Sequence, residues 1–326
     1  MSRRSVGIAV KIAAERFFLE YSMWILLIGT YAVLCLLIPS LATLQNVQNV
    51  LVQGVVVGCL SIGMGFVILT GNIDLSMVAI AGFAPLIGIY AVNWYNVPFY
   101  IAIIITILTG VGVGAFNGLM VEKLRIPSII QTLISWWVFW GLALIMTGGE
   151  AIAVLSEGWN WIGSAWIGPI RAIVLAYVLI IIVTVFLVSN TRTGLRLYLT
   201  GGNRVAAQAA GINTARSIVL SFMISGMFAA IAGYFLSARL ALITPRYAEE
   251  WFMPSIAAPV ISGFALTGGR GNFINLIAGA YLVQIIVVAV RLAGLGGWYE
   301  MLTQGLLILA AVLVDVARRR IMRLEE

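Results

Sequence analysis

The stretch VLVQGVVVGCLSIGMGFVIL, residues 50–69, contains no charged side chain. At 1.5 Å per residue, a helix of about 20 residues extends for about 30 Å, which is the thickness of the hydrocarbon core of a bilayer. The stretch therefore predicts a transmembrane helix. Comparable apolar runs occur at residues 22–38, 75–92, 98–119, 128–146, 171–188, 217–238, 254–267, 275–293 and 300–316.

The composition of the whole chain favours the same class of protein. Of its 326 residues, 62% are hydrophobic and 10% are charged, against roughly 45–50% and 25% in ordinary globular domains. A soluble fold has to cover its surface with polar groups, and this chain has too few of them. Disorder and a disulfide scaffold are also excluded, because the apolar content is high and the chain has two cysteines. We therefore expect an all-α integral membrane protein with about ten transmembrane helices.

The run at 254–267 is the weakest of the ten. It is short and contains Pro254, Pro259 and Gly263, so it predicts a tilted, broken or re-entrant helix. The basic residues bear on this choice, because cytoplasmic loops carry most of the lysine and arginine of membrane proteins. If all ten runs cross and the N-terminus is cytoplasmic, 15 of the 19 basic residues lie inside. We therefore expect ten crossings, one of them short or broken, and both termini in the cytoplasm.

The segments outside the apolar runs divide the chain further. Residues 1–21 predict a cytoplasmic amphipathic helix, residues 22–317 the transmembrane domain, and residues 318–326 a basic cytoplasmic tail. Within the transmembrane domain, we expect residues 147–170 to form a loop on the outer side of the membrane and residues 189–216 to form the longest cytoplasmic loop. The outer loop is rich in tryptophan, which prefers the headgroup region. It is either an interfacial belt or a docking surface or lid for a partner outside the cell membrane.

The residue types disfavour an enzyme. The chain contains no histidine, which is the commonest general base and metal ligand in proteins. We therefore expect no catalytic site, no metal and no cofactor. The stretch Gly268-Gly269-Arg270-Gly271 lacks the Gly-Lys-Ser/Thr of a phosphate-binding loop, so the chain shows no means of using ATP by itself. The net charge of +7 follows from the topology and does not indicate a nucleic-acid partner.

The cytoplasmic loop contains a short helix whose ends can be predicted. Asn203 is a favourable N-cap, the alanine-rich stretch from Arg204 favours helix, and Gly211 is a favourable stop. A short capped helix between two transmembrane helices is stiff, so it could pass movement from a soluble partner to the membrane. The alternative is an ordinary surface helix.

Polar residues at membrane depth are candidates for a transport pathway or gate. Asp74 lies in a polar break between two apolar runs. It could line the pathway or couple transport to protons, or it could instead cap the following helix. Polar residues in membrane bundles also join helices by hydrogen bonds, which leaves both roles open. The other candidates for the pathway or gate are Asn72, Asn117, Gln131 and Gln284.

A short repeat connects two distant parts of the chain. Leu69-Thr70-Gly71 recurs as Leu266-Thr267-Gly268, and Ala81-Gly82 recurs at the same offset as Ala278-Gly279. Duplicated halves are common in transporters. Matches of this length in glycine-rich segments also arise by chance.

Short motifs occur in a fixed order between about residues 50 and 316. They are TGNIDLS at 70–76, GAFNG at 114–118, TGG at 147–149, GGN and AGI at either end of 201–212, AAIAG at 229–233, the glycine-rich stretch 263–271 and AAVLVD at 310–315. Each motif is weak alone. Together they resemble the membrane permease subunits of bacterial ABC importers of the ribose, xylose, galactoside and autoinducer class.

This resemblance implies a permease of the bacterial inner membrane that has no ATPase of its own and moves a sugar or sugar-like solute. It implies two cytosolic ATP-binding subunits, a second permease subunit that is identical or related, and a periplasmic solute-binding protein. The loop 189–216 would be the coupling region that docks on the ATPase. Its residues that fit the family pattern are Asn203, Arg204, Ala206, Ala207 and Gly211. The chain departs from the family pattern at Asn72, Trp136, Trp137 and Trp140.

Two other functions compete with this interpretation. A self-sufficient secondary transporter, driven by a proton or sodium gradient, would need a titratable residue in its pathway, and Asp74 is the candidate. A membrane-embedded transferase or hydrolase is disfavoured by the lack of histidine and by the few acidic residues near the membrane surfaces.

Overall fold

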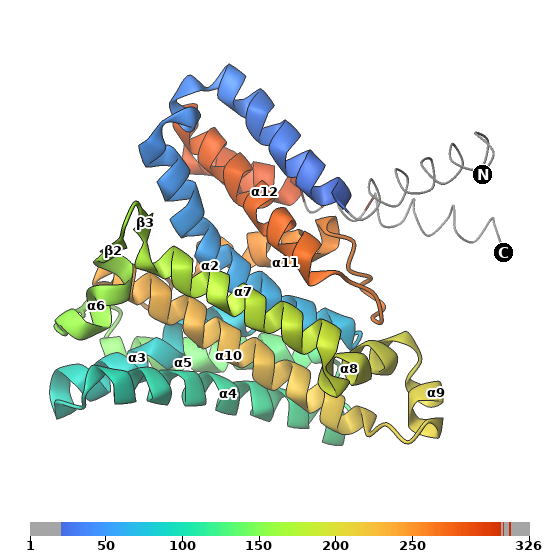
Figure 1. Ribbon diagram of the computed structural model, residues 1–326. Helices are drawn as coiled ribbons and strands as arrows, with labels where there is room; N and C mark the ends of the chain where they lie inside the picture. Colours follow the sequence, from blue (N-terminus) through green and yellow to red (C-terminus); the bar gives the residue numbers. More distant parts are fainter. Residues whose placement is uncertain (1–20, 308, 310–312, 314–326) are drawn as a thin grey trace, which may run out of the picture.

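The computed structural model describes residues 21–307, 309 and 313, and most of these residues are helical (Figure 1). Among them, seven helices are long and apolar enough to cross a bilayer. The prediction of an all-α membrane protein is confirmed. The seven helices are α2 Leu44–Leu69, α3 Met77–Tyr95, α4 Phe99–Lys123, α5 Ser128–Thr147, α7 Ala172–Asn190, α10 Thr214–Leu240 and α12 Phe273–Leu292.

Shorter elements connect these helices. A helix at Tyr21–Leu37 occupies the first predicted run. The predicted run 300–316 is only partly described, and the amphipathic segment 1–20 and the tail 318–326 lie outside the described residues. The short elements are η1 Pro39–Ala42, α6 Glu157–Ser164, α8 Arg192–Gly202, α9 Arg204–Ala209, η2 Glu249–Trp251, α11 Phe252–Ile261, and the antiparallel strand pairs β1 Ile152–Ala153 with β4 Leu242–Ile243 and β2 Trp166–Ile167 with β3 Ile170–Arg171.

Helix boundaries follow local chemical signals. Thr43 Oγ1 accepts a hydrogen bond from the backbone N–H of Asn46 at 3.4 Å where α2 begins. Asn272 Oδ1 caps α12 by accepting from the backbone N–H of Ile274 at 2.8 Å. Beyond the end of α2, Gly71 has a φ of 75°, in the left-handed region that glycine adopts without a steric cost. These caps satisfy backbone groups that a helix end leaves without a partner.

Helix α10 lies at the centre of the bundle, where it packs against α2, α3 and α4 (Figure 1). Glycines bring α4 and α10 together. A Cβ atom at Gly114 would lie 2.1 Å from the carbonyl oxygen of Phe222, and one at Gly226 would lie 2.1 Å from that of Gly110. Small residues at helix contacts are expected in a membrane, where close van der Waals packing holds the helices together.

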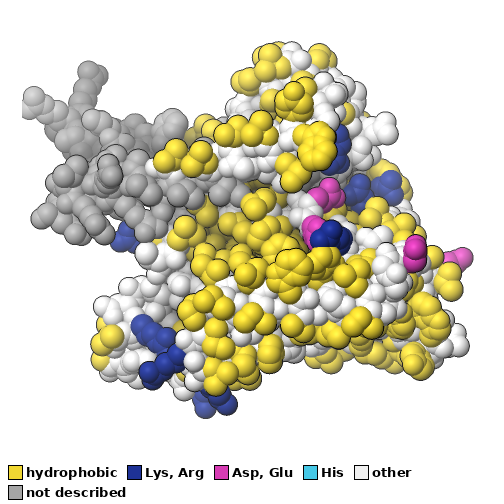
Figure 2. Space-filling model, turned by 180° about the vertical axis from the view of Figure 1, so that it is seen from behind, with side chains coloured by type: hydrophobic (Ala, Val, Ile, Leu, Met, Phe, Trp, Pro, Cys, Tyr) yellow, Lys and Arg dark blue, Asp and Glu magenta, His cyan; other side chains and the backbone are white. Residues whose placement is uncertain are grey.

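The two ends of the bundle carry different elements. Helix α6 and strands β2 and β3 lie at one end, and helices α8 and α9 lie at the other (Figure 1); we call these the α6 end and the α9 end. Hydrophobic side chains cover much of the face shown in Figure 2, with charged side chains at both ends and one small group of acidic and basic side chains nearer the middle. An apolar lateral surface between two charged ends suits a protein whose sides contact lipid.

The run at 254–267 forms a short helix with irregular flanks. Helix α11 has 10 residues and therefore rises about 15 Å, half the thickness of the hydrocarbon core. The chain around it still joins the two ends of the bundle. Strand β4, before α11, pairs with β1 near α6, and Gly269, after α11, donates its backbone N–H to the Leu69 carbonyl at the α9 end, at 2.9 Å. The expectation of one short or broken helix is confirmed.

Candidate coupling and transport sites

Helix α9 begins and ends where its sequence predicts. Asn203 Oδ1 accepts a hydrogen bond from the backbone N–H of Ala206 at 3.0 Å. Gly211 follows the helix with a φ of 79°, and the N–H of Ile212 donates to the carbonyl of Ala207 at 3.0 Å. A left-handed glycine and a bond back to the last turn are the usual way to end a helix. The predicted N-cap and stop are confirmed.

Helix α9 projects from the bundle and is held at its two ends. The Arg204 guanidinium forms an ion pair with the carboxylate of Glu122 near the end of α4. The Gln208 side-chain amide donates to Thr214 Oγ1 at the start of α10, at 2.9 Å. Ala207 is 4% exposed and faces inward, whereas Val205 is 77% exposed. The helix is thus attached to α4 and α10 and presents an apolar side chain to its surroundings.

Three segments meet through backbone contacts at the base of α9: the end of α2, the end of α8 and the loop after α11. The carbonyl oxygen of Leu69 accepts the hydrogen bond from Gly269, and a Cβ atom at Gly201 would lie 1.8 Å from that same oxygen. A Cβ atom at Gly269 would lie 2.4 Å from Gly202 Cα. Only glycine allows backbones to come this close. We call this contact the glycine junction.

The repeated tripeptides of the sequence lie against each other in this junction. A Cβ atom at Gly71 would lie 3.1 Å from the carbonyl oxygen of Thr267. The junction is extended by Tyr198 of α8, whose hydroxyl donates to the carbonyl of Gly271 at 2.6 Å. Burial raises the pKa of the Tyr198 phenol, so the group stays protonated as this bond requires. The short sequence repeat therefore corresponds to a direct contact between distant segments.

Asp74 is fully buried and forms hydrogen bonds through both carboxylate oxygens. Oδ1 accepts from the backbone N–H of Ser76 at 3.0 Å and from its hydroxyl at 2.5 Å. Oδ2 accepts from the Ser225 hydroxyl of α10 at 2.7 Å. The N-cap of α3 is Ser76, so Asp74 does not cap that helix itself. Asp74 instead binds the N-cap residue Ser76 and connects the segment 70–76 to α10.

Two more of the predicted residues join Asp74. The Asn117 side-chain amide of α4 donates to Ser76 Oγ at 2.8 Å. Gln131 of α5 donates to Asn117 Oδ1 at 3.3 Å and to Ser135 Oγ at 3.2 Å, and the Ser135 hydroxyl also donates to Asn117 Oδ1. All these side chains are buried. We call this set the Asp74 network; its members are Asp74, Ser76, Asn117, Gln131, Ser135 and Ser225.

The other two predicted residues lie apart from the Asp74 network. Asn72 donates to the carbonyl and to the hydroxyl of Thr70, both at 3.2 Å, within its own turn. Gln284 of α12 donates to Gln53 Oε1 of α2 at 3.0 Å. Among the residues that the structure describes, no cluster of three or more histidine, cysteine or acidic residues could hold a metal ion.

Two hydroxyl residues of α5 that the sequence did not single out also contribute to this site. Thr132 Oγ1 accepts from the backbone N–H of Leu75 at 3.1 Å, and Ser128 Oγ accepts from that of Ile73 at 3.3 Å. Both belong to α5 and hold the segment 70–76 in place. Serine and threonine are frequent in membrane helices, so nothing in the sequence marks these two against the rest.

The loop at residues 147–170, which contains α6, packs against α10. Trp159 is completely buried; its indole N–H donates to Ser237 Oγ at 3.1 Å, and its ring stands edge-on to that of Tyr234 with centroids 4.9 Å apart. Trp161 and Trp166 are 54% and 47% exposed. The interfacial-belt interpretation therefore suits the latter two residues, whereas Trp159 packs in the core.

Comparison with known families defines the class of the protein. A family model described as "Branched-chain amino acid transport system / permease component" matches residues 46–312. The match covers most of the chain, and the chain belongs to this permease family. It is therefore a multi-pass transport protein of the inner membrane.

Individual relatives place the chain more closely. The ribose import permease protein of Haemophilus influenzae is 30% identical over 304 residues, which cover 92% of this chain and 94% of the relative. The ribose import permease protein of Bacillus subtilis is 32% identical over 285 residues, covering 87% and 88%. The autoinducer 2 import system permease protein of Enterobacter sp. is 28% identical over 297 residues, covering 91% and 86%. No solved structure matches the chain. The resemblance to ABC import permeases of this class is confirmed.

Proposed function

We propose that the chain is the transmembrane subunit of an ATP-binding-cassette importer that moves a sugar or sugar-like solute inward by alternating access. Relatives named as import permeases for ribose and for autoinducer 2 support this class of solute. The observation that carries the proposal is α9, a capped and exposed helix. The end of α8, directly before it, contacts the end of α2 and the loop that precedes α12. ATP hydrolysis belongs to a separate subunit.

In this proposal the α9 end faces the cytoplasm, the α6 end faces the periplasm, and the chain crosses ten times with both termini inside. Helix α11 and its irregular flanks make one of the crossings. Arginines at the α6 end are partly balanced by carboxylates, as in the pairs Arg246–Glu249 at 3.1 Å and Arg291–Glu300 at 2.8 Å. The α9 end has an excess of basic residues, as a cytoplasmic surface should: Lys123, Arg125, Arg192, Arg196, Arg204 and Arg216.

The coupling residues have distinct tasks in this proposal. Asn203 and Gly211 fix the ends of α9, and Arg204 orients it against α4. Ala206 and Ala207 have small side chains, which allow the helix to pack closely between the ATPase and the bundle. The exposed Val205 supplies an apolar contact for the ATPase. A second permease subunit and a periplasmic binding protein, which docks at the α6 end, complete the importer.

Movement reaches the membrane through the glycine junction. When ATP closes the two ATPase subunits, α9 is displaced, and its base pushes on Leu69 and Gly269. Backbone contacts transmit such a displacement well, because no side chain can change its rotamer to absorb it. Leu69 directly precedes the segment 70–76, in which Asp74 binds α10 and, through Ser76, α4. The helices therefore shift as packed units, which is the way alternating access works in transporters.

A proton-coupled carrier using Asp74 is the alternative. Substitution Asp74→Asn separates the two functions, because an asparagine keeps a carbonyl oxygen for Ser76 and can donate its amide to Ser225. For the importer, ATP-dependent uptake should continue with a stability loss of about 1 kcal/mol. For the carrier, uptake would lose its dependence on a pH gradient. The measurement is uptake by proteoliposomes, with and without a pH gradient.

Reconstitution tests the proposal itself. Proteoliposomes that contain the chain, its ATPase and its binding protein should take up solute with ATP, and liposomes that contain the chain alone should not. Arg204→Glu places a second carboxylate against Glu122 and should leave ATP hydrolysis running while uptake falls. The matched control is Arg192→Glu, an exposed residue of α8, which should keep both activities. Uptake by the lone chain would contradict the proposal.

A further inference from the structure

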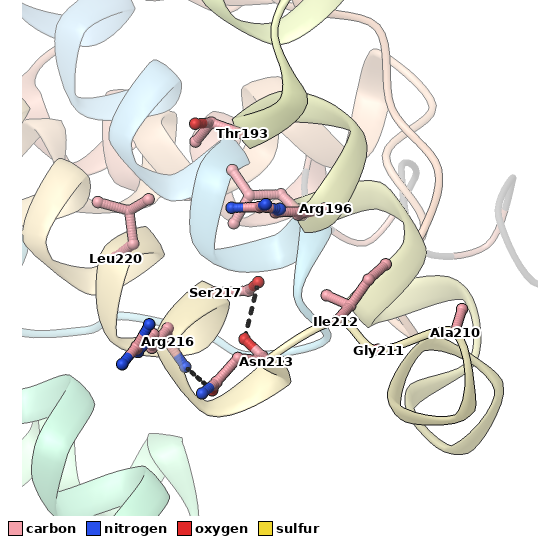
Figure 3. Close-up of a pocket in the computed structure, with 10 residues that line it drawn as sticks. Thr193, Arg196, Ala210, Gly211, Ile212, Asn213, Arg216, Ser217 and Leu220 are labelled. Atoms are coloured by element: carbon pink, nitrogen blue, oxygen red, sulfur yellow. Dashed lines mark hydrogen bonds between the residues drawn. The ribbon is translucent and has the colours of Figure 1, made fainter.

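A basic cavity lies at the α9 end, between α8, the α9–α10 link and the start of α10. Its volume is about 370 Å³. Arg196 comes from α8, Arg216 from the first turn of α10, and Thr193, Asn213 and Ser217 complete the polar part of its wall (Figure 3). The cavity lies where α7 has ended and α10 begins, which is the level of lipid headgroups beside membrane-spanning helices.

The chemistry of this cavity suits a phosphate group. Among the described residues, neither Arg196 nor Arg216 lies within ion-pair distance of a carboxylate; the nearby Glu122 is paired with Arg204. Guanidinium groups bind phosphate oxygens through paired hydrogen bonds. Asn213 Oδ1 caps the N-terminus of α10, a 27-residue helix, by accepting from the backbone N–H of Arg216 at 3.0 Å. The positive end of the helix dipole adds to the attraction for an anion.

An apolar groove continues from the cavity along the membrane-facing side of the bundle. It has a volume of about 250 Å³ and lies between α7 and α10. Thr193 borders both the groove and the basic cavity. Leu179 and Val183 of α7 line the groove and are 62% and 48% exposed. The groove therefore opens to the lipid side, and its lining has the chemistry of an acyl-chain site.

The two arginines also border a second groove on the other side of α10. This groove, of about 570 Å³, lies between α4 and α10 and adds Lys123, together with Glu122, to the charged side chains. Leu119, Val219 and Met223 form its apolar part. The guanidinium groups are thus flanked by an apolar groove on either side of one helix.

We propose that this site binds one anionic phospholipid of the inner leaflet. Its phosphate lies between Arg196 and Arg216, and an acyl chain lies in the groove between α7 and α10. A free anion would leave the groove empty, and a zwitterionic lipid would bring a cationic group beside its phosphate, which the two arginines repel. Basic pockets between transmembrane helices on the cytoplasmic side are suited to anionic headgroups. The lipid would also touch Gly211 and Ile212, which join α9 to α10. The inference does not depend on the ATPase, because the isolated subunit contains the whole site.

Native mass spectrometry of the full chain in detergent tests the proposal. The chain is titrated with phosphatidylglycerol and with phosphatidylcholine. Wild type should retain one phosphatidylglycerol and bind phosphatidylcholine about tenfold less well, and the double variant Arg196→Gln/Arg216→Gln should lower phosphatidylglycerol affinity by about tenfold or more. The matched control Arg192→Gln removes a charge from the same helix outside the cavity and should keep wild-type binding. Equal retention by the double variant would overturn the proposal.

Two further measurements distinguish the parts of the site. Val183→Trp fills the groove and keeps the arginines, so it should also weaken phosphatidylglycerol binding while the melting temperature stays near that of wild type. Inorganic phosphate at millimolar concentration should not displace the lipid. Displacement by phosphate would show a small-anion site, and loss of ATPase binding in the arginine variant with unchanged lipid binding would show a protein contact. Either result would contradict the phospholipid assignment.

Discussion

The contacts that hold the helices together differ between the two ends of the bundle. At the α6 end a large side chain, Trp159, is buried between α6 and α10 and held by Ser237 and Tyr234. At the α9 end the contact between α2, α8 and the loop after α11 is made by the backbone itself, at Gly201 and Gly269. One end is held by a buried aromatic side chain, and at the other end the central contact is between backbone segments.

This difference suits a molecule that is driven from one end. A buried aromatic core resists deformation because its packing has few alternatives. A backbone junction passes a push on α9 through the end of α8 to α2, because no side chain lies between these segments to absorb it. We therefore expect the α6 end to act as the fixed part of each subunit and the α9 end as the moving part.

The largest effect should come from Gly201→Ala. The added Cβ atom would lie 1.8 Å from the Leu69 carbonyl oxygen, so the junction has to open. We expect loss of uptake, together with a melting temperature well below that of wild type or a failure to accumulate in the membrane. Uptake assays and thermal unfolding in detergent measure this.

The neighbouring glycine provides the control. A Cβ atom at Gly202 would meet only Gly269 Cα, at 4.0 Å, and alanine is the better helix former by about 1 kcal/mol. Gly202→Ala should therefore keep uptake and stability. Equal uptake and stability of the two variants would contradict a role for the glycine junction in transport.

A smaller effect is expected for Trp159→Ala at the other end. Removal of a buried aromatic ring typically costs about 3–5 kcal/mol in free energy of unfolding. Unfolding in detergent should show this loss, whereas Trp161→Ala, which truncates an exposed ring, should change little. In the fraction of the variant that still folds, the ratio of solute moved to ATP hydrolysed should stay normal, because we propose that the coupling is at the α9 end. A changed ratio would contradict the proposal that the α6 end is the fixed part of the subunit.

The smallest effect concerns Tyr198→Phe. This change removes one hydrogen bond to Gly271 and should cost about 1 kcal/mol of stability. Because burial raises the pKa of Tyr198 in the folded state, the bond's contribution is complete below the ordinary phenol pKa of about 10 and is lost as the pH rises through the folded value. The difference in melting temperature between wild type and variant should be constant from pH 7 to 9 and shrink above that range. A difference that grows with pH would contradict this.

Local features could be predicted from the sequence, and tertiary features could not. The ends of α9 follow from Asn203 and Gly211, because a cap and a left-handed stop depend only on neighbouring residues. The helices over the apolar runs follow from length and hydrophobicity. Helix α6 was not predicted within residues 147–170, because its sequence has no long apolar run and its stability comes from the burial of Trp159.

The candidate pathway residues show the same limit. Asp74, Asn117 and Gln131 were selected as polar groups at membrane depth, and they meet in one network. Gln284 was selected by the same rule but pairs with Gln53, because polarity does not reveal which helix faces which. The glycine junction appeared in the sequence as a short repeat, and only the three-dimensional structure shows that its two copies touch.

Hydrogen–deuterium exchange of the assembled importer tests the central claim most directly. The backbone amides of residues 203–211 should exchange quickly in the isolated chain, because α9 is exposed, and should become protected when the ATPase subunit binds. Arg192 and its neighbours at the start of α8 should change less. Unchanged exchange at 203–211, with protection elsewhere on the chain, would contradict the claim that α9 binds a separate ATPase subunit and transmits its movement.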